Sequence, residues 1–294
     1  MWIAGLVKHD AIDSWPLTKS NRYALHMRKL GRAARTIQSH INAIKSFTKW
    51  LAQHHKLPRD PLQSVRGPNP TTSRARERRM LLPDEWPRLR DATRVGPDRQ
   101  GKTGHERFLL YATAIQTGLR AKELRQLTRG RMFLDLETPY IACKAGTTKN
   151  GKTAKQYLET QLAGELRDYL ANRSNGSRVF PMPHESNTAR ILRADLAEAR
   201  AAWLKEAEED ADELARREAS DFLLATNAEG ECFDFHSLRH TCGAWLALAG
   251  EHPKVVQTIM RHSQITLTMD TYGHLFPGQA AEAVSQFGHM LNEG

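Results

Sequence analysis

The sequence predicts a mainly α-helical protein of two domains, in which the second domain also contains a small β-hairpin or sheet. Apolar residues recur at spacings of three and four along most of the 294 residues, the pattern of amphipathic helices. Residues 139–159 break this period with two short strand-like runs. Charge is unevenly divided: residues 1–80 hold 16 basic and 4 acidic residues, and residues 81–294 hold 27 and 29. We therefore expect a small basic helical unit followed by a larger α+β unit.

The composition excludes several classes of protein. At roughly 100–200 residues per domain the length allows two domains. The 40% of apolar and 26% of charged residues exclude a wholly disordered chain. No run approaches the ~20 apolar residues of a membrane helix, and the N-terminal residues make a poor secretory signal. The cysteines Cys143, Cys232 and Cys242 are odd in number and far apart, which argues against a disulfide framework and fits a reducing cytoplasm.

The basic unit is expected to be a helical bundle. Residues 36–52 have the spacing of an amphipathic helix with Thr36 as its N-cap, and an earlier helix is expected over about 20–30. In the earlier helix Tyr23, Met27 and Leu30 are expected to face inward. In the later one, most of the apolar residues are expected on one face: Ile37, Ile41, Ile44, Phe47, Trp50 and Leu51.

Basic side chains gather at the ends and outer faces of these helices. A strongly basic unit of this size indicates a polyanionic partner, most often nucleic acid, and an ordinary solvated basic surface is the alternative. Cations placed in this way can grip DNA phosphates without reading bases. The candidate DNA contacts in this unit are Arg32, Arg35, Lys45 and Lys49.

Residues 67–79 are expected to form an extended linker because they combine prolines, glycine and small polar residues. With residue 66 included, the stretch contains five arginines. They would suit tracking along a DNA backbone, and a plain solvated linker is an equally good interpretation. The candidate DNA contacts here are Arg74, Arg76, Arg78 and Arg79.

The second unit is expected to begin with a helix start at residues 83–86, where acidic residues follow a proline. Residues 106–117 form an apolar helix that Gly118 ends. A helix then restarts over 119–127, with Leu119, Leu124 and Leu127 on its buried side. Short strands are expected at 140–143 and 156–158, around a lysine-rich segment whose Asn150-Gly151 pair predicts a tight turn.

Residues 188–219 are expected to form one or two helices, with Leu196, Trp203 and Leu214 on one stripe. The segment 195–221 holds 10 acidic and 4 basic residues. We expect this acidic helical insertion to turn away from DNA because like charges repel. It is interpreted either as a partner or regulatory surface or as a solvated amphipathic insertion. Further helices are expected within 231–248, 253–260, 267–275 and about 279–291.

Residues with chemical potential are densest between His236 and His274. His236 and Arg239 are three apart and share a helix face, and Arg120 follows a helix break far upstream. His236 and His240, four apart, could chelate zinc. Position 237, however, is Ser rather than the Glu of a protease motif, and the neighbouring arginine would repel a cation. We therefore expect no metal.

Taken together, these side chains suit the chemistry of a phosphodiester. Arginine clamps phosphate with two bonds, and histidine donates further hydrogen bonds. Each lost donor of this kind costs roughly 3–4 kcal/mol of transition-state stabilisation. Tyrosine can serve as the nucleophile, and lysine can protonate the leaving alkoxide. Taken singly, each residue is more simply a surface or packing residue, so only the collection indicates function.

With these residues in this order, the sequence resembles a known family, the tyrosine recombinases or phage-type integrases. Four motifs occur in the order of the family and at suitable distances, and the resemblance spans most of the chain. The matching segments are Thr117 to Leu124, Thr148-Lys149 before Asn150-Gly151, His236 to Thr241, and His262 to His274.

The resemblance implies a role for each matching residue. Tyr272 is the nucleophile, Arg120 and Arg239 clamp the scissile phosphate, and His236 and His262 donate hydrogen bonds or carry protons. Lys149 is the general acid, with Lys152 as the second candidate and Lys144 behind it. Glu123 and His240 support the two arginines.

The resemblance also implies the fold, the reaction and the partners. A core-binding domain (1–66) and a catalytic domain (80–294), joined by the linker 67–79, would clamp duplex DNA. Strand exchange would pass through a 3′-phosphotyrosyl bond and a Holliday junction, without metal, cofactor or ATP. Four copies would assemble on paired DNA sites. The protein would be cytoplasmic and associated with the nucleoid, and it would act for a phage or another mobile element. An accessory DNA-bending or directionality factor is compatible with this scheme. The segment 279–291 would dock on a neighbouring copy or fold back on its own domain.

One residue departs from the family pattern, and other functions stay open. Arg261 stands where the family usually has glycine, and it would alter the loop or add a phosphate contact. A type IB topoisomerase shares the chemistry but relaxes DNA as a monomer. A DNA-binding module that has lost catalysis is the alternative from another class. Integration, excision and resolution are not distinguished by the sequence.

Overall fold

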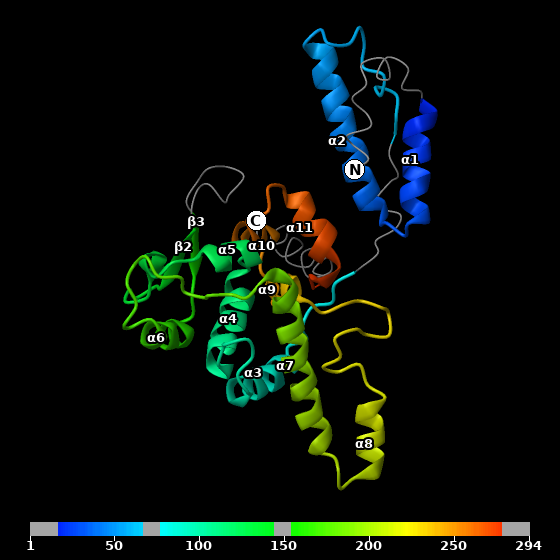
Figure 1. The fold of residues 1–294 in the computed structure, drawn as a ribbon. Coiled ribbons are helices and arrows are strands. Elements are labelled where there is room, and N and C mark those ends of the chain that lie inside the picture. The colour runs from blue at the N-terminus through cyan, green and yellow to red at the C-terminus, as the bar shows by residue number, and fades with distance from the viewer. Residues whose placement is uncertain (1–16, 67–76, 144–153, 278–294) are drawn as a thin grey trace, which may run out of the picture. The chain divides into compact units, whose positions relative to one another are not determined.

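The computed structural model describes residues 17–66, 77–143 and 154–277. The chain divides into two compact units, Met1–Glu77 and Arg78–Gly294, and the division falls inside the expected linker. Both units are built mainly from helices, and the second contains a three-stranded antiparallel sheet (Figure 1). The predicted fold class is therefore confirmed.

In the first unit, α1 (Leu17–Lys29) packs against α2 (Ala34–Gln53). A small core of Ile37, Ile41, Leu62 and Val65 holds the unit together. Helix α2 begins earlier than expected, and Ala33 rather than Thr36 occupies the N-cap position.

The expectation that Leu30 faces inward is wrong, and Phe47 and Trp50 fall outside the buried face that most apolar residues of the later helix were expected to form. Leu30, Phe47 and Trp50 are 56%, 56% and 47% exposed. The reason is helical phase. Two turns beyond Ile41 the buried position is Thr48, and Phe47 and Trp50 point about 100° and 160° away from it around the helix axis.

The candidate DNA contacts of this unit differ in accessibility. Arg32, Arg35 and Lys49 are exposed, whereas Lys45 is half-buried and donates a hydrogen bond to the carbonyl of Val65. Arg74 and Arg76 lie outside the described residues.

The second unit is built around α4 (Gly104–Thr117), which is buried on nearly all sides. It starts with a reciprocal capping box between Thr103 and Glu106. It ends, as predicted, at Gly118, which has the left-handed φ of 59°. The chain restarts in α5 (Ala121–Gln126) with Leu119, Leu124 and Leu127 buried, also as predicted. Helix α3 (Glu85–Val95) packs against α4.

The sheet has the order β1 (Met132–Phe133), β2 (Tyr140–Cys143) and β3 (Ala154–Tyr157). Ile141 pairs with Met132 on one side and with Gln156 on the other. Strand β1 was not predicted because two residues carry no alternation pattern. The segment between β2 and β3, with Lys144, Lys149, Lys152 and the Asn150-Gly151 pair for which a tight turn was predicted, lies outside the described residues.

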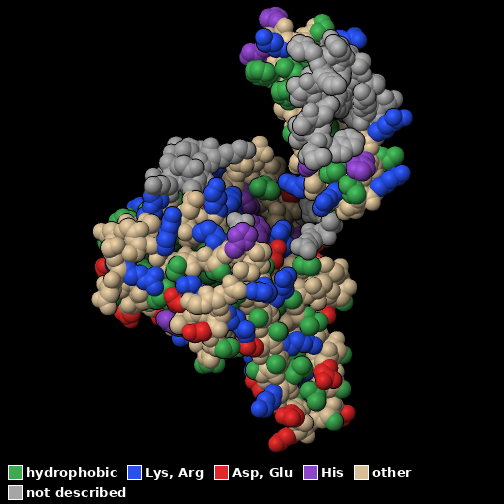
Figure 2. Space-filling model, in the orientation of Figure 1, with side chains coloured by type: hydrophobic (Ala, Val, Ile, Leu, Met, Phe, Trp, Pro, Cys, Tyr) green, Lys and Arg blue, Asp and Glu red, His purple; other side chains and the backbone are tan. Residues whose placement is uncertain are grey.

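Helix α6 (Thr160–Tyr169) follows the sheet, and α7 (Glu185–Lys205) and α8 (Ala211–Glu218) cover the predicted acidic segment. The structure corrects the limits of that insertion. Helix α7 packs along α3, and Asp195, Leu196 and Ala199 are buried, so the start of the predicted insertion belongs to the core. Only the far end of α7 and α8 extend from the body (Figure 1), and acidic side chains gather there (Figure 2).

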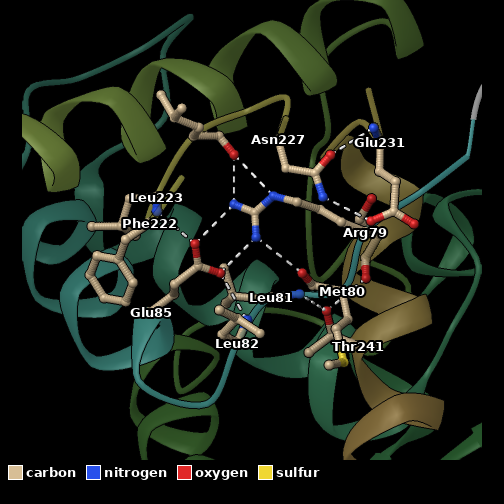
Figure 3. A network of polar contacts seen from close by, with 12 residues as sticks. Arg79, Met80, Leu81, Leu82, Glu85, Phe222, Leu223, Asn227, Glu231 and Thr241 are labelled. Atoms are coloured by element: carbon tan, nitrogen blue, oxygen red, sulfur yellow. Dashed lines mark hydrogen bonds and ion pairs between the residues drawn. The ribbon is translucent and has the colours of Figure 1, made fainter. Parts of the chain in front are cut away.

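The expectation that Arg79 contacts DNA from the linker is also corrected. The side chain is 8% exposed, and its guanidinium bonds both carboxylate oxygens of Glu85 at 2.7 and 3.0 Å (Figure 3). Further bonds reach the carbonyls of Met80 and Leu224, so all five N–H donors are used. Because Glu85 is completely buried, Arg79 anchors the start of this unit and is not available to a phosphate.

The C-terminal part of the described chain consists of α9 (Phe235–Leu248), α10 (Pro253–Met260) and α11 (Ile265–Tyr272), with a 3₁₀ turn at Gly273–Leu275. These elements form a second small core that includes Cys242, Val256, Met260 and Tyr272. All three cysteines are free. The predicted helix 279–291 lies outside the described residues. Within the described part of the chain, no helix is both long and apolar enough to cross a membrane.

Candidate active site

The N-terminus of α9 presents two predicted site residues, His236 and Arg239, one turn apart. Asp234 caps this helix by accepting the backbone N–H groups of His236 and Ser237 at 2.8 and 3.2 Å. Ser237 closes the box by accepting the N–H of Asp234 at 3.0 Å. Arg78 Nε then binds both oxygens of Asp234 at 3.1 and 3.0 Å. The half-exposed Arg78 thus has a role in holding α9, besides its predicted contact with DNA.

Arg239 is buried where three helices meet. It is 4% exposed, and its guanidinium donates hydrogen bonds to the carbonyls of Gly118 and Met260. These carbonyls lie at the C-terminal ends of α4 and α10, the negative ends of the two helix dipoles. Burial, with the nearby cations of Arg120 and Arg261, lowers the pKa of Arg239 to about 10, so it is charged at neutral pH.

Arg120 occupies the N-cap position of α5, directly after the left-handed turn at Gly118. Its backbone N–H donates to Glu123 Oε2 at 2.7 Å. Its guanidinium lies 3.4 Å from Glu123 Oε1, and the side chain is 44% exposed. Local structure therefore holds the backbone of Arg120 while leaving its charged head open to a ligand.

Glu123 is shared between α5 and the end of α10. Its Oε2 also accepts a hydrogen bond from Arg261 Nη2, and both side chains are 8% exposed. Burial by itself raises the pKa of Glu123, but the bonds from the Arg120 backbone and from Arg261 outweigh it and hold the pKa below its usual range. Glu123 is therefore ionised. We call Arg120, Arg239, Arg261 and Glu123 the cationic cluster.

Tyr272, the last residue of α11, is 2% exposed. Its ring lies against Gly243 of α9, where an added Cβ would approach the phenol carbon to 2.3 Å. The ring of His240 stacks at 5.2 Å and that of His262 at 6.3 Å, nearly parallel. Burial raises the pKa of Tyr272 well above its usual value, opposed by the positive charge of Arg239. The phenol is therefore protonated at neutral pH, and its ring is buried in the domain.

The two histidines with a predicted catalytic role, His236 and His262, are kept neutral. Burial, with the charges of Arg239 and Arg120, lowers the pKa of His262 to about 4. Desolvation and neighbouring cations, Arg78 first among them, lower the pKa of His236 to about 4, although that side chain reaches the surface. His262 Nδ1 is held by a hydrogen bond with the buried Thr268 Oγ1 at 2.9 Å. Neutral imidazoles can either donate a hydrogen bond or accept a proton.

The structure thus brings together most of the predicted site. Arg120 and Glu123 come from α5, His236, Arg239 and His240 from α9, and His262 and Tyr272 from α10–α11 and their connection. Lys149 lies outside the described residues. Within the described segments, no group of three or more His, Cys, Asp or Glu side chains could hold a metal ion.

Several positioning residues escaped the sequence prediction. Asp234 could have been found, because it stands three residues before Ser237 in a capping-box pattern. Gly243 and Thr268 have no such signal, since their importance arises from Tyr272 and His262, which lie on other elements.

This arrangement can bind and polarise an anionic tetrahedral group. Arg120 offers an open guanidinium, Arg239 adds fixed positive charge, and neutral histidines stand beside a buried phenol. Preorganised donors and cations of this kind stabilise charge that develops in a transition state. A phosphodiester next to Tyr272 is the substrate that this chemistry fits.

Comparison with known proteins agrees with the geometry. Residues 79–278 match the model of the phage integrase family. The tyrosine recombinase XerC-like protein of Caldanaerobacter subterraneus subsp. tengcongensis is 24% identical, over 92% of this chain and 70% of its own length. The tyrosine recombinase XerC of Pelotomaculum thermopropionicum is 26% identical, over 92% of this chain and 80% of its own.

Solved structures show the same fold. The Tn1549 transposon integrase in complex with a circular intermediate DNA aligns with a TM-score of 0.61 at 17% identity, over 95% of this chain and 87% of that one. The XerH site-specific recombinase bound to a palindromic difH substrate aligns with a TM-score of 0.60 at 14% identity, over 92% and 72%. The family match covers well over half of the sequence and includes every described residue of the site. The resemblance seen in the motifs is thereby confirmed, and the chain belongs to the phage integrase family as a tyrosine recombinase.

Proposed function

We propose that this recombinase cuts and rejoins DNA at a specific site, with Tyr272 as its nucleophile. The observation that carries the proposal is the convergence of three elements on one point. Arg239 links α4, α9 and α10 through two helix-end carbonyls, and the Tyr272 ring packs on the same helix α9. A phosphate bound by Arg120 and Arg239 would therefore lie beside the phenol.

The reaction follows from the charges around that phosphate. The Tyr272 oxygen attacks phosphorus, the bond to the 5′ oxygen breaks, and a 3′-phosphotyrosyl ester forms. Arg120 and Arg239 stabilise the charge that develops on the non-bridging oxygens, as a metal ion would otherwise do. A neutral imidazole, His236 or His262, accepts the phenol proton, and Lys149 supplies a proton to the 5′-hydroxyl that leaves.

Rejoining reverses the same steps on a different strand. The 5′-hydroxyl of a partner strand attacks the phosphotyrosyl ester, Tyr272 leaves, and a new phosphodiester forms. One ester replaces another at each step, so the bond energy is conserved and no ATP is consumed. Two rounds of exchange between paired sites pass through a Holliday junction.

The remaining parts of the proposal concern assembly. The basic first unit, with exposed Arg32, Arg35 and Lys49, would grip the DNA backbone opposite the catalytic unit and so complete a clamp. Four copies would act on two sites, with or without an accessory DNA-bending factor. A role in a mobile element fits the transposon integrase that shares this fold. With DNA as its substrate, the protein would act at the nucleoid, in the cytoplasm.

The test is covalent capture on DNA. Wild-type protein is incubated with random duplexes that carry suicide nicks, and detergent-resistant adducts are recovered and sequenced. We expect a 3′-linked adduct enriched for one inverted repeat, and no adduct from Tyr272→Phe, which should keep its DNA affinity. Adducts without sequence enrichment would instead indicate topoisomerase-like relaxation. Binding without any adduct would contradict the proposal and leave a non-catalytic DNA-binding module.

A further inference from the structure

Arg261 has a backbone conformation that suits glycine. It ends α10 with φ 51° and ψ 45°, in the left-handed region. Side chains with a Cβ are disfavoured there, and such residues concentrate at functional sites. Glycine would form the same turn without strain, so the turn itself does not explain the arginine.

The side chain of Arg261 is as unusual as its backbone. It is 8% exposed, and Nη2 donates to Glu123 Oε2. Its Nε and Nη1 atoms are buried, with no hydrogen-bond partner in the described part of the chain. Buried donors without partners are unfavourable. The protein therefore keeps a strained residue with two unpaired donors beside its predicted phosphate site.

The effect of Arg261 on its neighbours follows from the shared carboxylate. Glu123 Oε2 accepts both Arg261 and the backbone N–H of Arg120. Only Oε1 faces the Arg120 guanidinium, at the long distance of 3.4 Å. Among the described residues, Arg261 is the side chain that ties the Glu123 carboxylate to the end of α10, so its removal would release the carboxylate on that side. Glu123 could then form a close two-bond pair with Arg120, the geometry that arginine and carboxylate favour.

We propose that Arg261 is a positioning residue that holds the Glu123 carboxylate away from the Arg120 guanidinium and so keeps Arg120 free for the scissile phosphate. This inference rests on the proposed function, because the phosphate is the ligand for which Arg120 is kept. It also explains why a cation stands here. Arg261 offsets the negative charge of Glu123, and the cationic cluster keeps an excess of positive charge for an anionic substrate.

The test compares single-turnover cleavage by the wild type, Arg261→Gly and Arg261→Lys at saturating DNA. We expect Arg261→Gly to cleave about 10- to 100-fold more slowly, the usual range for a misplaced transition-state donor, with unchanged DNA affinity. Arg261→Lys, which retains the charge, should recover most of the rate. Gln100→Gly is the matched control. Gln100 is exposed and has the same φ of 51°, so this change relieves a similar backbone without touching Glu123 and should leave cleavage unchanged.

A second background separates action through Glu123 from direct contact with DNA. In Glu123→Gln the charge that competes for Arg120 is gone, while an amide oxygen can still cap α5. We expect Arg261→Gly to slow this variant by less than about threefold, because the single-mutant effects of coupled residues are not additive. The proposal would be overturned if Arg261→Gly cleaved DNA at the wild-type rate. It would also be overturned if Arg261→Gly lowered the cleavage rate equally in the Glu123 and Glu123→Gln backgrounds.

A structural readout keeps the inference independent of activity. A crystal structure of Arg261→Gly should show the Glu123 carboxylate closed on Arg120 by two short bonds, and an unchanged separation would refute the inference. If the wild type itself formed no adduct, the proposed function would fail while this structure still decided the role of Arg261.

Discussion

Two arginine–carboxylate clusters of the second unit differ in their balance of charge. In the first, Asp195 on α7 is fully buried and accepts hydrogen bonds from Arg99, Arg107 and Tyr111 at 2.8 to 3.0 Å. Glu198 pairs with Arg99 as well. We call these five residues the balanced cluster, because it contains two carboxylates and two guanidinium groups. It ties α4 to α7.

The cationic cluster has three arginines for one carboxylate. Its donors are only partly used: Arg120 is 44% exposed, and two nitrogens of Arg261 have no partner among the described residues. The two clusters lie in the same domain and use the same residue types. The difference indicates that paired charge holds the fold together in the balanced cluster, whereas the excess positive charge of the cationic cluster suits the anion proposed to bind there.

The largest expected effect comes from removing the carboxylate of the balanced cluster. Asp195→Ala leaves the buried Arg107, which is 2% exposed, without its counter-charge. Breaking a buried ion pair in this way costs about 3–5 kcal/mol of unfolding free energy, measured by urea denaturation. The control is Asp91→Ala, which removes the exposed Arg90–Asp91 pair and should cost less than about 0.5 kcal/mol. Equal losses would show that Asp195 has no special structural role.

A change in the cationic cluster should lower the cleavage rate strongly and the stability of the fold only slightly. Arg120→Ala is expected to lower the rate of DNA cleavage by about 10²–10³-fold, because an exposed phosphate donor is lost. The unfolding free energy should change by less than about 1 kcal/mol, since the Arg120–Glu123 pair is long and half-exposed. Arg90→Ala, another half-exposed arginine, should affect neither quantity. If Arg120→Ala lost much stability but cleaved DNA normally, the cationic cluster would serve the fold and not the site.

The smallest expected effect is a pH dependence of stability that arises from the histidines beside the cationic cluster. The pKa of His262 is lowered to about 4 in the folded protein, against an ordinary value near 6.5. Between these values the unfolded chain binds more protons than the folded one, so stability rises with pH and is lost as pH falls toward 4. His236 acts in the same direction. Thermal melting of His262→Gln between pH 4.5 and 7 should therefore show a shallower dependence than the wild type. An identical slope would mean that His262 titrates normally.

Much of the fold could be predicted because its signals are local. The apolar run of α4, its stop at Gly118 and the restart in α5 depend on neighbouring residues, and the structure agrees with them. Candidate site residues could be proposed from the sequence because their motifs resemble those of the family, and the structure brings most of the described ones together. Burial was harder to predict. Arg79 in a linker-like stretch and Asp195 in an acidic helix both looked solvent-exposed, and both are buried in ion pairs. Their burial depends on groups far along the chain, the carbonyl of Leu224 for Arg79 and the guanidinium of Arg107 for Asp195.

By itself, the sequence determined most of the helical segments, the two strands β2 and β3, and a set of candidate residues for phosphodiester chemistry. Tertiary structure decided how each charged residue is used. Arg79 and Arg120 have the same side chain, but Arg79 forms a buried ion pair with Glu85, whereas the Arg120 side chain is 44% exposed to solvent. Tyr272 can be buried because Gly243, on another helix, leaves room for its ring. The physical reason is that the free energy of a charge or a phenol depends on burial and on partners, which come from segments far apart in the chain.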